Sequence, residues 1–158
     1  MLGYFSVGKT SLVKRFVESI FSEKYHSTIG VKIDKKRVTI DGVELNLMIW
    51  DLAGDDSYEN IKTAYLKGAS GFLVIADGTQ SISVDIAIDI RNNLQQKFPN
   101  IPFIILINKD DLKQHWEVAQ PQIKQLQEAD IQVVQTSAKT GVLVKESFED
   151  LGRLILSL

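Results

Sequence analysis

Apolar residues follow two patterns along this chain, and each pattern predicts a different kind of element. Continuous apolar runs bounded by glycine or polar residues predict buried strands, whereas apolar positions at helical spacing predict amphipathic helices. The Asp41-Gly42 dipeptide between two apolar runs predicts a hairpin, because it favours the tightest strand connection. We expect strands at 31–40, 43–51, GFLVIAD, IPFIILIN and IQVVQTS, and helices at 9–20, 83–97, 117–128 and 144–157.

The alternation of strands and helices predicts the fold class. Strands that are apolar on both faces belong to a mostly parallel sheet covered by helices on either side, which is a three-layer α/β/α arrangement. At 158 residues the chain is expected to form one domain, over 1–158. In such sheets ligands bind at the carboxyl ends of the strands. Polar residues that directly follow a strand are therefore the candidates for a site.

Composition and charge narrow the range of partners. A net charge of −2 gives no basic surface for nucleic acid. Without cysteine there is no disulfide, no thiolate metal site and no prenylated or palmitoylated anchor on this chain. The longest apolar runs are too short to span a bilayer, and the first residues lack the pattern of a signal peptide. A cytoplasmic location is therefore expected.

The first residues contain GYFSVGKTS, which fits the pattern G-x-x-x-x-G-K-[ST]. Gly3 and Gly8 permit backbone conformations in which successive N–H groups point at one anion, and the following helix adds its positive end. Lys9 brings a charge to the terminal phosphates, and the Thr10 hydroxyl is a ligand for Mg²⁺. The alternative is a glycine turn that happens to precede a helix. The predicted triphosphate site also includes Ser6, Val7 and Ser11.

Polar motifs also end three of the predicted strands. In WDLAG the aspartate is placed to hold Mg²⁺ through a water, and the glycine N–H to meet a terminal phosphate. NKDD contains N-K-x-D, and TSAKTG ends the last strand. Taken singly, each motif has an ordinary structural explanation. WDLAG is explained as well by a turn that ends a strand, NKDD by a polar turn, and TSAKTG by a helix N-cap. The candidate residues are Asp51, Gly54, Asn108, Lys109, Asp111, Ser137, Ala138 and Lys139.

The choice of base follows from hydrogen-bonding chemistry. Guanine presents an N1–H and a 2-amino group side by side, and the Asp111 carboxylate can accept both bonds. The Ala138 N–H would meet the guanine O6. Adenine would face the same two groups with mismatched atoms and would leave buried polar groups unpaired, at about 1–3 kcal/mol each. The arrangement therefore favours guanine.

All four motifs occur in one order, each at the carboxyl end of a strand, and together they resemble the Ras superfamily of small GTPases. The resemblance covers the whole chain and is greatest to the Rab-like branch, because STIGVKI resembles switch I and WDLAG followed by TAYLKGA resembles switch II. The likeness is to a prokaryotic Rab-like member more than to a eukaryotic one. It implies the P-loop NTPase fold of a small G domain, and a switch that binds GTP with Mg²⁺ and hydrolyses it to GDP.

The resemblance also implies roles for single residues. Asn108 would brace the base and the loops, the stem of Lys109 would lie along a face of the base, and Phe21 would pack against the guanine. Thr28 matches the switch I threonine that ligates Mg²⁺ and meets the γ-phosphate, and Gly54 meets the same phosphate from switch II. For Phe21 the alternative is a hydrophobic residue that ends the first helix.

Protein partners are implied in the same way. Ile33, Trp50 and Tyr65 fall where Rab-like proteins present hydrophobic residues to effectors, with Ile33 in place of the usual phenylalanine. The alternative is that Trp50 and Tyr65 are ordinary packing residues between the sheet and a helix, because exposed apolar patches mark partners only when they are contiguous.

Two substitutions depart from the family pattern and predict a slow enzyme. Asp55 stands where the family has the glutamine that orients the attacking water. Its charge lies beside a γ-phosphate that is itself anionic. Phe5 stands where Ras has glycine, and its ring would crowd the space that an arginine finger uses. A GTP-binding scaffold with negligible hydrolysis is therefore the alternative function.

The residues before the phosphate loop are few. Only Met1 and Leu2 remain for a strand that is central in the family's sheet, so the first strand is expected to be truncated and the core to contain a gap. From this we expect Met1 not to be the start of the natural domain. A G domain excised from a larger regulatory protein is therefore the second alternative.

Overall fold

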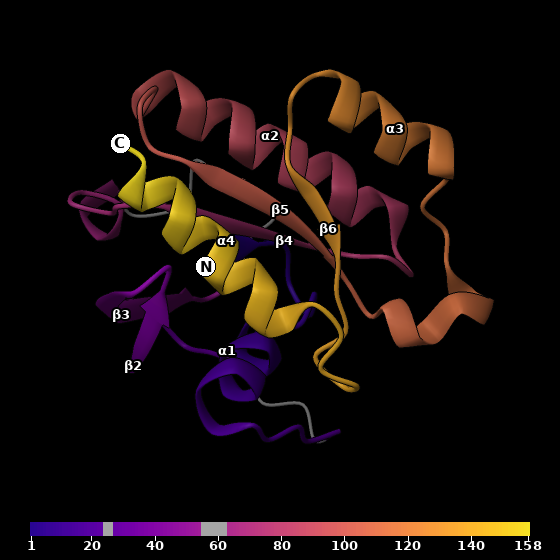
Figure 1. The fold of residues 1–158 in the computed structure, drawn as a ribbon. Helices are drawn as coiled ribbons and strands as arrows, with labels where there is room; N and C mark the ends of the chain where they lie inside the picture. Colours follow the sequence, from indigo (N-terminus) through magenta and orange to yellow (C-terminus); the bar gives the residue numbers. More distant parts are fainter. Residues whose placement is uncertain (24–26, 55–62) are drawn as a thin grey trace.

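Parallel strands form the centre of the molecule in a computed structural model that describes residues 1–23, 27–54 and 63–158 (Figure 1). Four strands are hydrogen-bonded in the order β1-β4-β5-β6, and every neighbouring pair is parallel. The prediction of an α/β fold with a mostly parallel sheet is confirmed. The strands are β1 (Leu2–Gly3), β4 (Phe72–Asp77), β5 (Phe103–Asn108) and β6 (Val133–Gln135).

The helices lie on both faces of these strands, as the alternating pattern predicts (Figure 1). Strand residues alternate between two hydrophobic clusters because successive side chains point to opposite faces. Val74 and Ile105 pack towards α2 and α3, whereas Ile75 and Ile104 pack towards α1 and α4. The helices are α1 (Lys9–Glu18), α2 (Ser81–Lys97), α3 (Gln120–Glu128) and α4 (Val144–Leu156), with short 3-10 turns at Thr63–Tyr65 and Asp110–His115.

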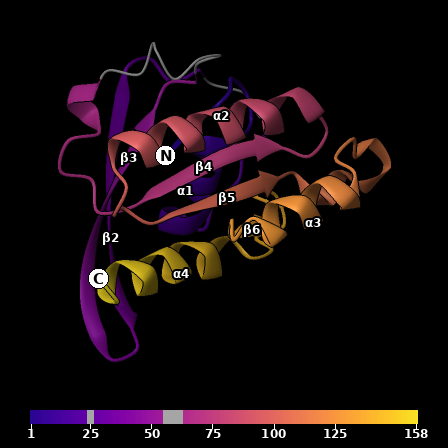
Figure 2. The same cartoon turned by 90° about the horizontal axis from the view of Figure 1, so that it is seen from above.

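The predicted hairpin is present and forms a separate two-stranded antiparallel sheet of β2 (Val31–Ile40) and β3 (Val43–Leu52). Both turn residues have positive φ, 49° at Asp41 and 83° at Gly42, which is the conformation that this dipeptide favours. Figure 2 shows the hairpin on one side of the parallel strands.

Helix ends differ from the prediction by a few residues, and the causes are local. The first helix stops at Glu18, because Ser19 has a left-handed conformation (φ 60°) and donates its N–H to the Arg15 carbonyl. Ile20, predicted on the buried helix face, is therefore 53% exposed. The third helix begins at Gln120, where the next residue, Pro121, occupies the first turn. The 3-10 turn at Asp110–His115 was not predicted.

A gap was expected beside the short β1, and a pocket of about 480 Å³ opens there between β3 and β4. It is lined mainly by apolar side chains, among them Leu45, Tyr65 and Ile155. Met1 reaches the hairpin across it, because its terminal nitrogen donates to the Trp50 carbonyl at 2.8 Å and its carbonyl accepts from Leu52 N at 3.4 Å. The backbone thus contacts the hairpin through Met1 and the parallel sheet through β1.

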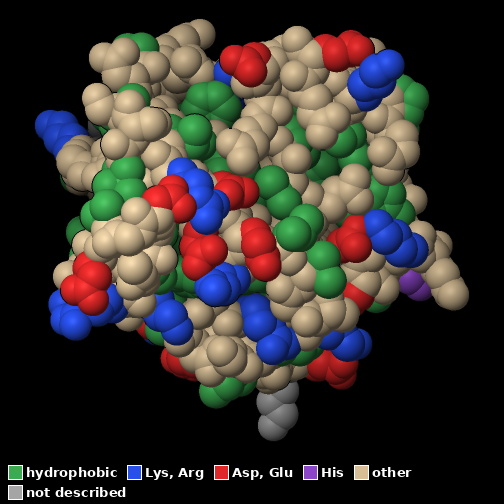
Figure 3. Space-filling model, in the orientation of Figure 1, with side chains coloured by type: hydrophobic (Ala, Val, Ile, Leu, Met, Phe, Trp, Pro, Cys, Tyr) green, Lys and Arg blue, Asp and Glu red, His purple; other side chains and the backbone are tan. Residues whose placement is uncertain are grey.

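Charged side chains of both signs are interspersed on the face that Figure 3 shows. Within the described ranges, no helix has both the length and the apolar character needed to cross a membrane.

Candidate functional site

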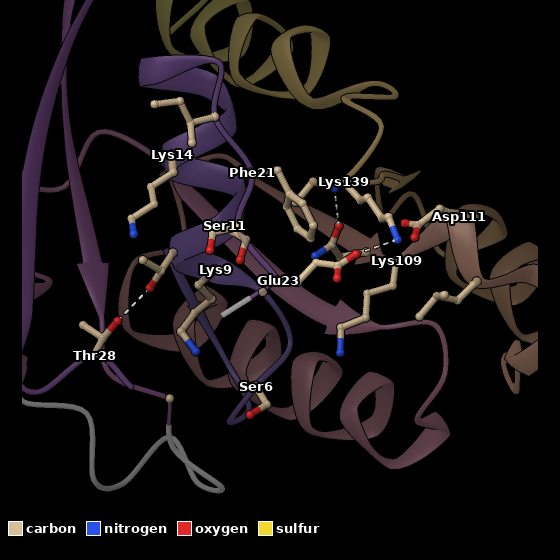
Figure 4. A pocket seen from close by; sticks show the side chains of 18 of the residues that line it. Ser6, Lys9, Ser11, Lys14, Phe21, Glu23, Thr28, Lys109, Asp111 and Lys139 are labelled. Atoms are coloured by element: carbon tan, nitrogen blue, oxygen red, sulfur yellow. Dashed lines mark hydrogen bonds and ion pairs between the residues drawn. The ribbon is translucent and has the colours of Figure 1, made fainter. Parts of the chain in front are cut away.

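A pocket of about 480 Å³ opens at the carboxyl ends of the parallel strands, where the four motifs meet (Figure 4). Ser6, Lys9 and Thr28 lie towards one end of it, and Lys109 and Asp111 lie at the other. Most of the predicted residues line this pocket. They are Ser6, Gly8, Lys9, Thr10, Ser11, Phe21, Thr28, Gly54, Asn108, Lys109, Asp111, Ala138 and Lys139.

The remaining predicted residues lie just behind the pocket wall or outside the described ranges. Val7, Asp51 and Ser137 are buried, and each is hydrogen-bonded to a residue that lines the pocket. Gly3 accepts a bond from Lys9 through its carbonyl. Asp55, the predicted catalytic residue, lies outside the described residues.

Backbone crowding explains the glycines of the phosphate loop. Gly3 has a φ of 142°, and a Cβ there would lie 2.2 Å from the Ile75 carbonyl oxygen. Gly8 has a φ of 97°, and a Cβ there would lie 2.3 Å from Asn108 Nδ2. The loop therefore packs directly against β4 and β5, and side chains at these positions would push it away from them. Gly8 is also the N-cap of α1, whose first turn lines the pocket and has no side-chain cap on its N–H groups.

Lys9 is held at the centre of the loop. Its Nζ donates to the carbonyls of Gly3 at 3.1 Å and Tyr4 at 2.9 Å, and the residue is only 6% exposed. Burial lowers the pKa of Lys9 to about 8, and the nearby Asp51 carboxylate offsets only part of that effect. A phosphate would restore a counter-charge at the pocket end.

Three oxygen-bearing side chains from distant segments meet beside Lys9. Thr10 Oγ1 lies 2.7 Å from Thr28 Oγ1 and donates to Asp51 Oδ2 at 2.5 Å. Asp51 is fully buried, and its Oδ1 has no hydrogen-bond partner among the residues that the structure describes. Burial raises the pKa of this carboxyl, and the Thr10 bond and the Lys9 charge offset part of the rise.

This donor set fits Mg²⁺. Hydroxyl and carboxylate oxygens are the ligands that this ion prefers, and a divalent cation would satisfy the unpaired Asp51 oxygen, directly or through a water. No group of three His, Cys, Asp or Glu side chains that could hold a metal occurs in the described part of the chain. The candidate magnesium site therefore depends on the threonine hydroxyls.

Asn108 connects three loops around the pocket. Its Nδ2 donates to the Val7 carbonyl at 3.0 Å, and its Oδ1 accepts from Ala138 N at 3.1 Å and from Thr136 Oγ1 at 3.5 Å. The bracing role implied by the resemblance thus has a direct geometric basis. The Ala138 N–H that was expected to meet O6 already has an acceptor in this structure.

The other residues at the pocket end predicted to hold the base are also held by hydrogen bonds or ion pairs. Ser137 Oγ donates to Asp111 Oδ1 at 2.5 Å, and it accepts from Thr140 N at 3.1 Å. The N-cap alternative for Ser137 is wrong, because α4 begins at Val144 with Leu143 as its N-cap and has no side-chain cap. The Ser137 hydroxyl instead holds the turn at Thr140 and orients Asp111. Lys139 pairs with Glu23 at 3.1 Å across the pocket, beside Phe21 (Figure 4).

Two residues that contact the site were not predicted from the sequence. Arg15, on α1, donates from Nε to the Ala138 carbonyl at 2.7 Å and from a terminal nitrogen to the Lys139 carbonyl. Asp77, at the end of β4, forms an ion pair with Lys109 at 2.6 Å. Asp77 ends a buried strand just as Asp51 and Asn108 do, and this position was the signal that could have found it. Arg15 belongs to no motif, so the sequence offers no comparable signal.

The hydrophobic triad is only partly exposed, because Tyr65 is half-buried and packs against the apolar core. Ile33 and Trp50 are paired across the hairpin and are 46% and 39% exposed. The rings of Trp50 and Tyr65 lie 6.4 Å apart at a tilt of 46°. The packing alternative thus holds for Tyr65, whereas Ile33 and Trp50 form an exposed pair beside it.

A glycine loop and helix N-terminus at the carboxyl edge of a parallel sheet, with N-K-x-D at the end of β5 in the same sheet, define a P-loop nucleotide-binding protein. Comparison with known proteins gives the family. The Ras family profile matches residues 1–157. The chain is 35% identical to Ras-related protein Rab-13 of Rattus norvegicus over 161 residues, which cover 99% of this chain and 78% of that protein. It is also 35% identical to human Ras-related protein Rab-8B over 159 residues, which cover 99% and 77%.

This chain therefore belongs to the Ras family of small GTPases, and its sequence is Rab-like. Membership of the family implies binding of guanine nucleotide and Mg²⁺, and partners of the effector and regulator kind.

Proposed function

We propose that this chain is a single G domain that acts as a molecular switch, binding GTP with Mg²⁺ and hydrolysing it slowly to GDP. One observation carries the proposal. The Thr10, Thr28 and Asp51 oxygens meet beside Lys9 at one end of a pocket whose other end holds Asp111. The phosphates of a nucleotide would thus lie beside the Lys9 charge and the metal-ligating oxygens. Its base would lie beside Asp111, which can accept hydrogen bonds from it.

Guanine would be recognised by the Asp111 carboxylate, which lines the pocket and has one of its two oxygens bonded to Ser137. The guanine O6 would share the Ala138 N–H with Asn108 or take the neighbouring Lys139 N–H. The stem of Lys109 and the ring of Phe21 would provide the apolar walls of the base site.

The switch would operate through Thr28 and Gly54, which are brought to the phosphate loop from two different segments. A Cβ on Gly54 would lie 2.7 Å from the Phe5 Cα and 2.9 Å from Lys9 Nζ, so the two backbones approach very closely. Bound Mg²⁺ would supply positive charge that stabilises the phosphates. Losing the γ-phosphate would remove the group to which both segments are attached, which is an order-to-disorder switch.

Effectors and regulators would read this state through switch I, switch II and the patch of Ile33, Trp50 and Tyr65. The cytoplasm supplies GTP and Mg²⁺ and is the location that we assign.

Nucleotide extraction from purified protein, followed by calorimetry with GTP, GDP and ATP, tests the ligand assignment. We expect GDP or GTP in the extract and at least 10³-fold weaker binding of ATP, since buried polar mismatches discriminate by roughly 10⁴–10⁵. ATP affinity within tenfold of GTP affinity would contradict the assignment.

Intrinsic hydrolysis is expected to be no faster than the unassisted Ras-type rate of roughly 10⁻⁴ s⁻¹. Asp55 cannot donate the hydrogen bond that a glutamine amide gives, and it places negative charge near the γ-phosphate. Asp55→Gln should therefore raise the single-turnover rate. A slower Asp55→Gln variant would show instead that Asp55 acts as a general base for water, and our account of the rate would be wrong.

A GTP-binding scaffold with negligible hydrolysis is the second candidate, and Phe5 favours it. This ring is 49% exposed beside the phosphate loop and lines the pocket. It would exclude an arginine finger, whose contribution is about 10³–10⁵ in rate. Absence of any single-turnover hydrolysis, with GTP binding intact, would favour the scaffold. A G domain excised from a larger regulator stays open as an alternative, and the sequences flanking this chain would test it.

Nucleotide affinity should depend on pH because of Lys9. Phosphate binds the ammonium form, and the pKa of about 8 in the ligand-free protein means that this form is lost above pH 8. Affinity for GDP should therefore fall as the pH rises from 7.5 to 9, by up to about tenfold per unit. Fluorescent-GDP titration of wild type and Lys9→Met measures this. The variant should bind weakly with a flatter pH profile, and an equal slope in both proteins would exclude Lys9 as the titrating group.

A further inference from the structure

Asp77 is a fully buried carboxylate with a dense set of partners at the end of β4. Its Oδ1 accepts from the backbone N–H of Thr79 at 2.9 Å and from Thr79 Oγ1 at 2.8 Å. Its Oδ2 accepts from Gln80 Nε2 at 3.0 Å and forms the ion pair with Lys109 Nζ at 2.6 Å. Both oxygens are therefore satisfied, and the charge is balanced by one cation that comes from the neighbouring strand end.

Lys109 is the only one of these partners that lines the nucleotide pocket. Its amino group points away from Asp111 (Figure 4). The pairing thus fixes the far end of the side chain beside β4, while the four-carbon stem stays at the pocket wall. The register supports this arrangement, because Asp77 and Asn108 are directly paired between β4 and β5.

The backbone at Lys109 is also unusual. Its φ is 70°, a left-handed conformation that residues other than glycine adopt at a cost of about 1–3 kcal/mol when the surroundings enforce it. Asp110 N donates to the Thr136 carbonyl at 3.0 Å, and Leu112 N donates to the Lys109 carbonyl at 2.9 Å. These bonds hold the loop backbone, but they do not determine where the lysine side chain lies. Within the described part of the chain, the pair with Asp77 does.

We propose that Asp77 is a positioning residue for base binding, which acts by holding the Lys109 stem along the pocket wall where a guanine ring would lie. This inference rests on the proposed function. Without the Asp77 charge, the Lys109 ammonium would be drawn to solvent or to the Asp111 carboxylate. It would then compete for the acceptor that the guanine N1–H and 2-amino group need.

A purely structural role is the competing explanation, because Asp77 also accepts from Thr79 and Gln80 at the start of α2. The two roles differ in how Asp77 depends on Lys109. A structural role would act whatever residue stands at position 109. A positioning role would vanish once Lys109 no longer carries a charge to be held.

The test is a double-mutant cycle on the dissociation rate of a fluorescent GDP analogue from the full chain. We expect Asp77→Asn and Lys109→Met each to speed GDP dissociation by about tenfold. Because the two residues are in contact and act together, the double variant should dissociate GDP no faster than Lys109→Met. Asp110→Asn is the matched control, because it breaks the neighbouring pair with Lys113 in the same turn without touching the pocket. This control should leave dissociation unchanged.

Each other outcome has a clear meaning. Wild-type protein that fails to bind the analogue would overturn the proposed function and this inference with it. Wild-type binding with an unchanged Asp77→Asn rate, or with additive effects in the double variant, would overturn this inference alone. If Asp77→Asn does not fold, Lys109→Arg and Lys109→Met decide. The arginine can still pair with Asp77 and should dissociate GDP more slowly than the methionine variant, and equal rates would contradict the proposal.

Discussion

Asp111→Asn should lower the affinity for GTP and GDP by roughly 10²-fold or more, because charge-assisted hydrogen bonds contribute about 1.5–3 kcal/mol each. The amide keeps one acceptor oxygen but loses the charge and presents an N–H₂ group to the donors of guanine. The same N–H₂ can donate to the additional carbonyl of xanthine. The preference should therefore move towards xanthosine nucleotides.

Calorimetry with GDP and XDP on wild type and variant measures this exchange of specificity. Asp110→Asn is the control, since it removes a neighbouring carboxylate that pairs with Lys113 outside the pocket. That variant should keep the wild-type preference. GDP affinity retained within tenfold by Asp111→Asn would show that this carboxylate does not read the base.

Lys9→Met is the second large effect, and its two readouts should move in opposite directions. Nucleotide affinity should fall by roughly 10²–10³-fold, because the ammonium is the charged side chain buried in the phosphate loop and its bonds to phosphate are charge-assisted. The ligand-free protein should become more stable. The pKa of Lys9 is lowered from 10.5 to about 8 mainly by burial, which corresponds to about 3 kcal/mol against the charged form.

Part of that gain is offset, since the Gly3 and Tyr4 carbonyls lose their donor. We expect a rise in melting temperature of about 2–6 °C at pH 7. The sign of the pH dependence follows from linkage. Between about 8 and 10.5 the unfolded chain binds the Lys9 proton more tightly, so wild-type stability rises with pH and the advantage of the variant shrinks.

Thermal unfolding of both ligand-free proteins at pH 7 and pH 9.5 separates these effects. Lys35→Met, at an exposed position on the outer face of β2, is the control and should change neither affinity nor stability appreciably. If ligand-free Lys9→Met is less stable than ligand-free wild type, the main role of Lys9 is to stabilise the loop and not to bind phosphate.

The fold was predictable because its causes are local. Continuous apolar runs become β4 and β5, and the Asp41-Gly42 turn sets the pairing of the hairpin residue by residue. Errors occur where one residue's conformation decides an end. Ser19 in the left-handed region stops α1, and nothing in the apolar pattern of 9–20 indicates it.

The site was predictable as far as its motifs extend. Asp51, Asn108 and Asp111 were found because each lies at or just beyond the end of a strand in a recognisable pattern. The hydrogen bonds and ion pairs that connect the motifs were not found, because they depend on which side chains the fold brings together. Arg15 meets Ala138 only because α1 lies beside the last loop, and Asp77 meets Lys109 only because β4 and β5 are neighbours.

The reach of Asn108 and Arg15 along the sequence has a consequence for biosynthesis. The Asn108 bond to Val7 spans 101 positions, and the Arg15 bond to Ala138 spans 123. Such distant partners come together only when the intervening chain has been made, and contacts of this range form slowly. A nascent chain that carries the phosphate loop, synthesised first, has no complete pocket until the last strand and its loop leave the ribosome. We therefore expect nucleotide binding to occur late in synthesis, after the pocket residues have all been made.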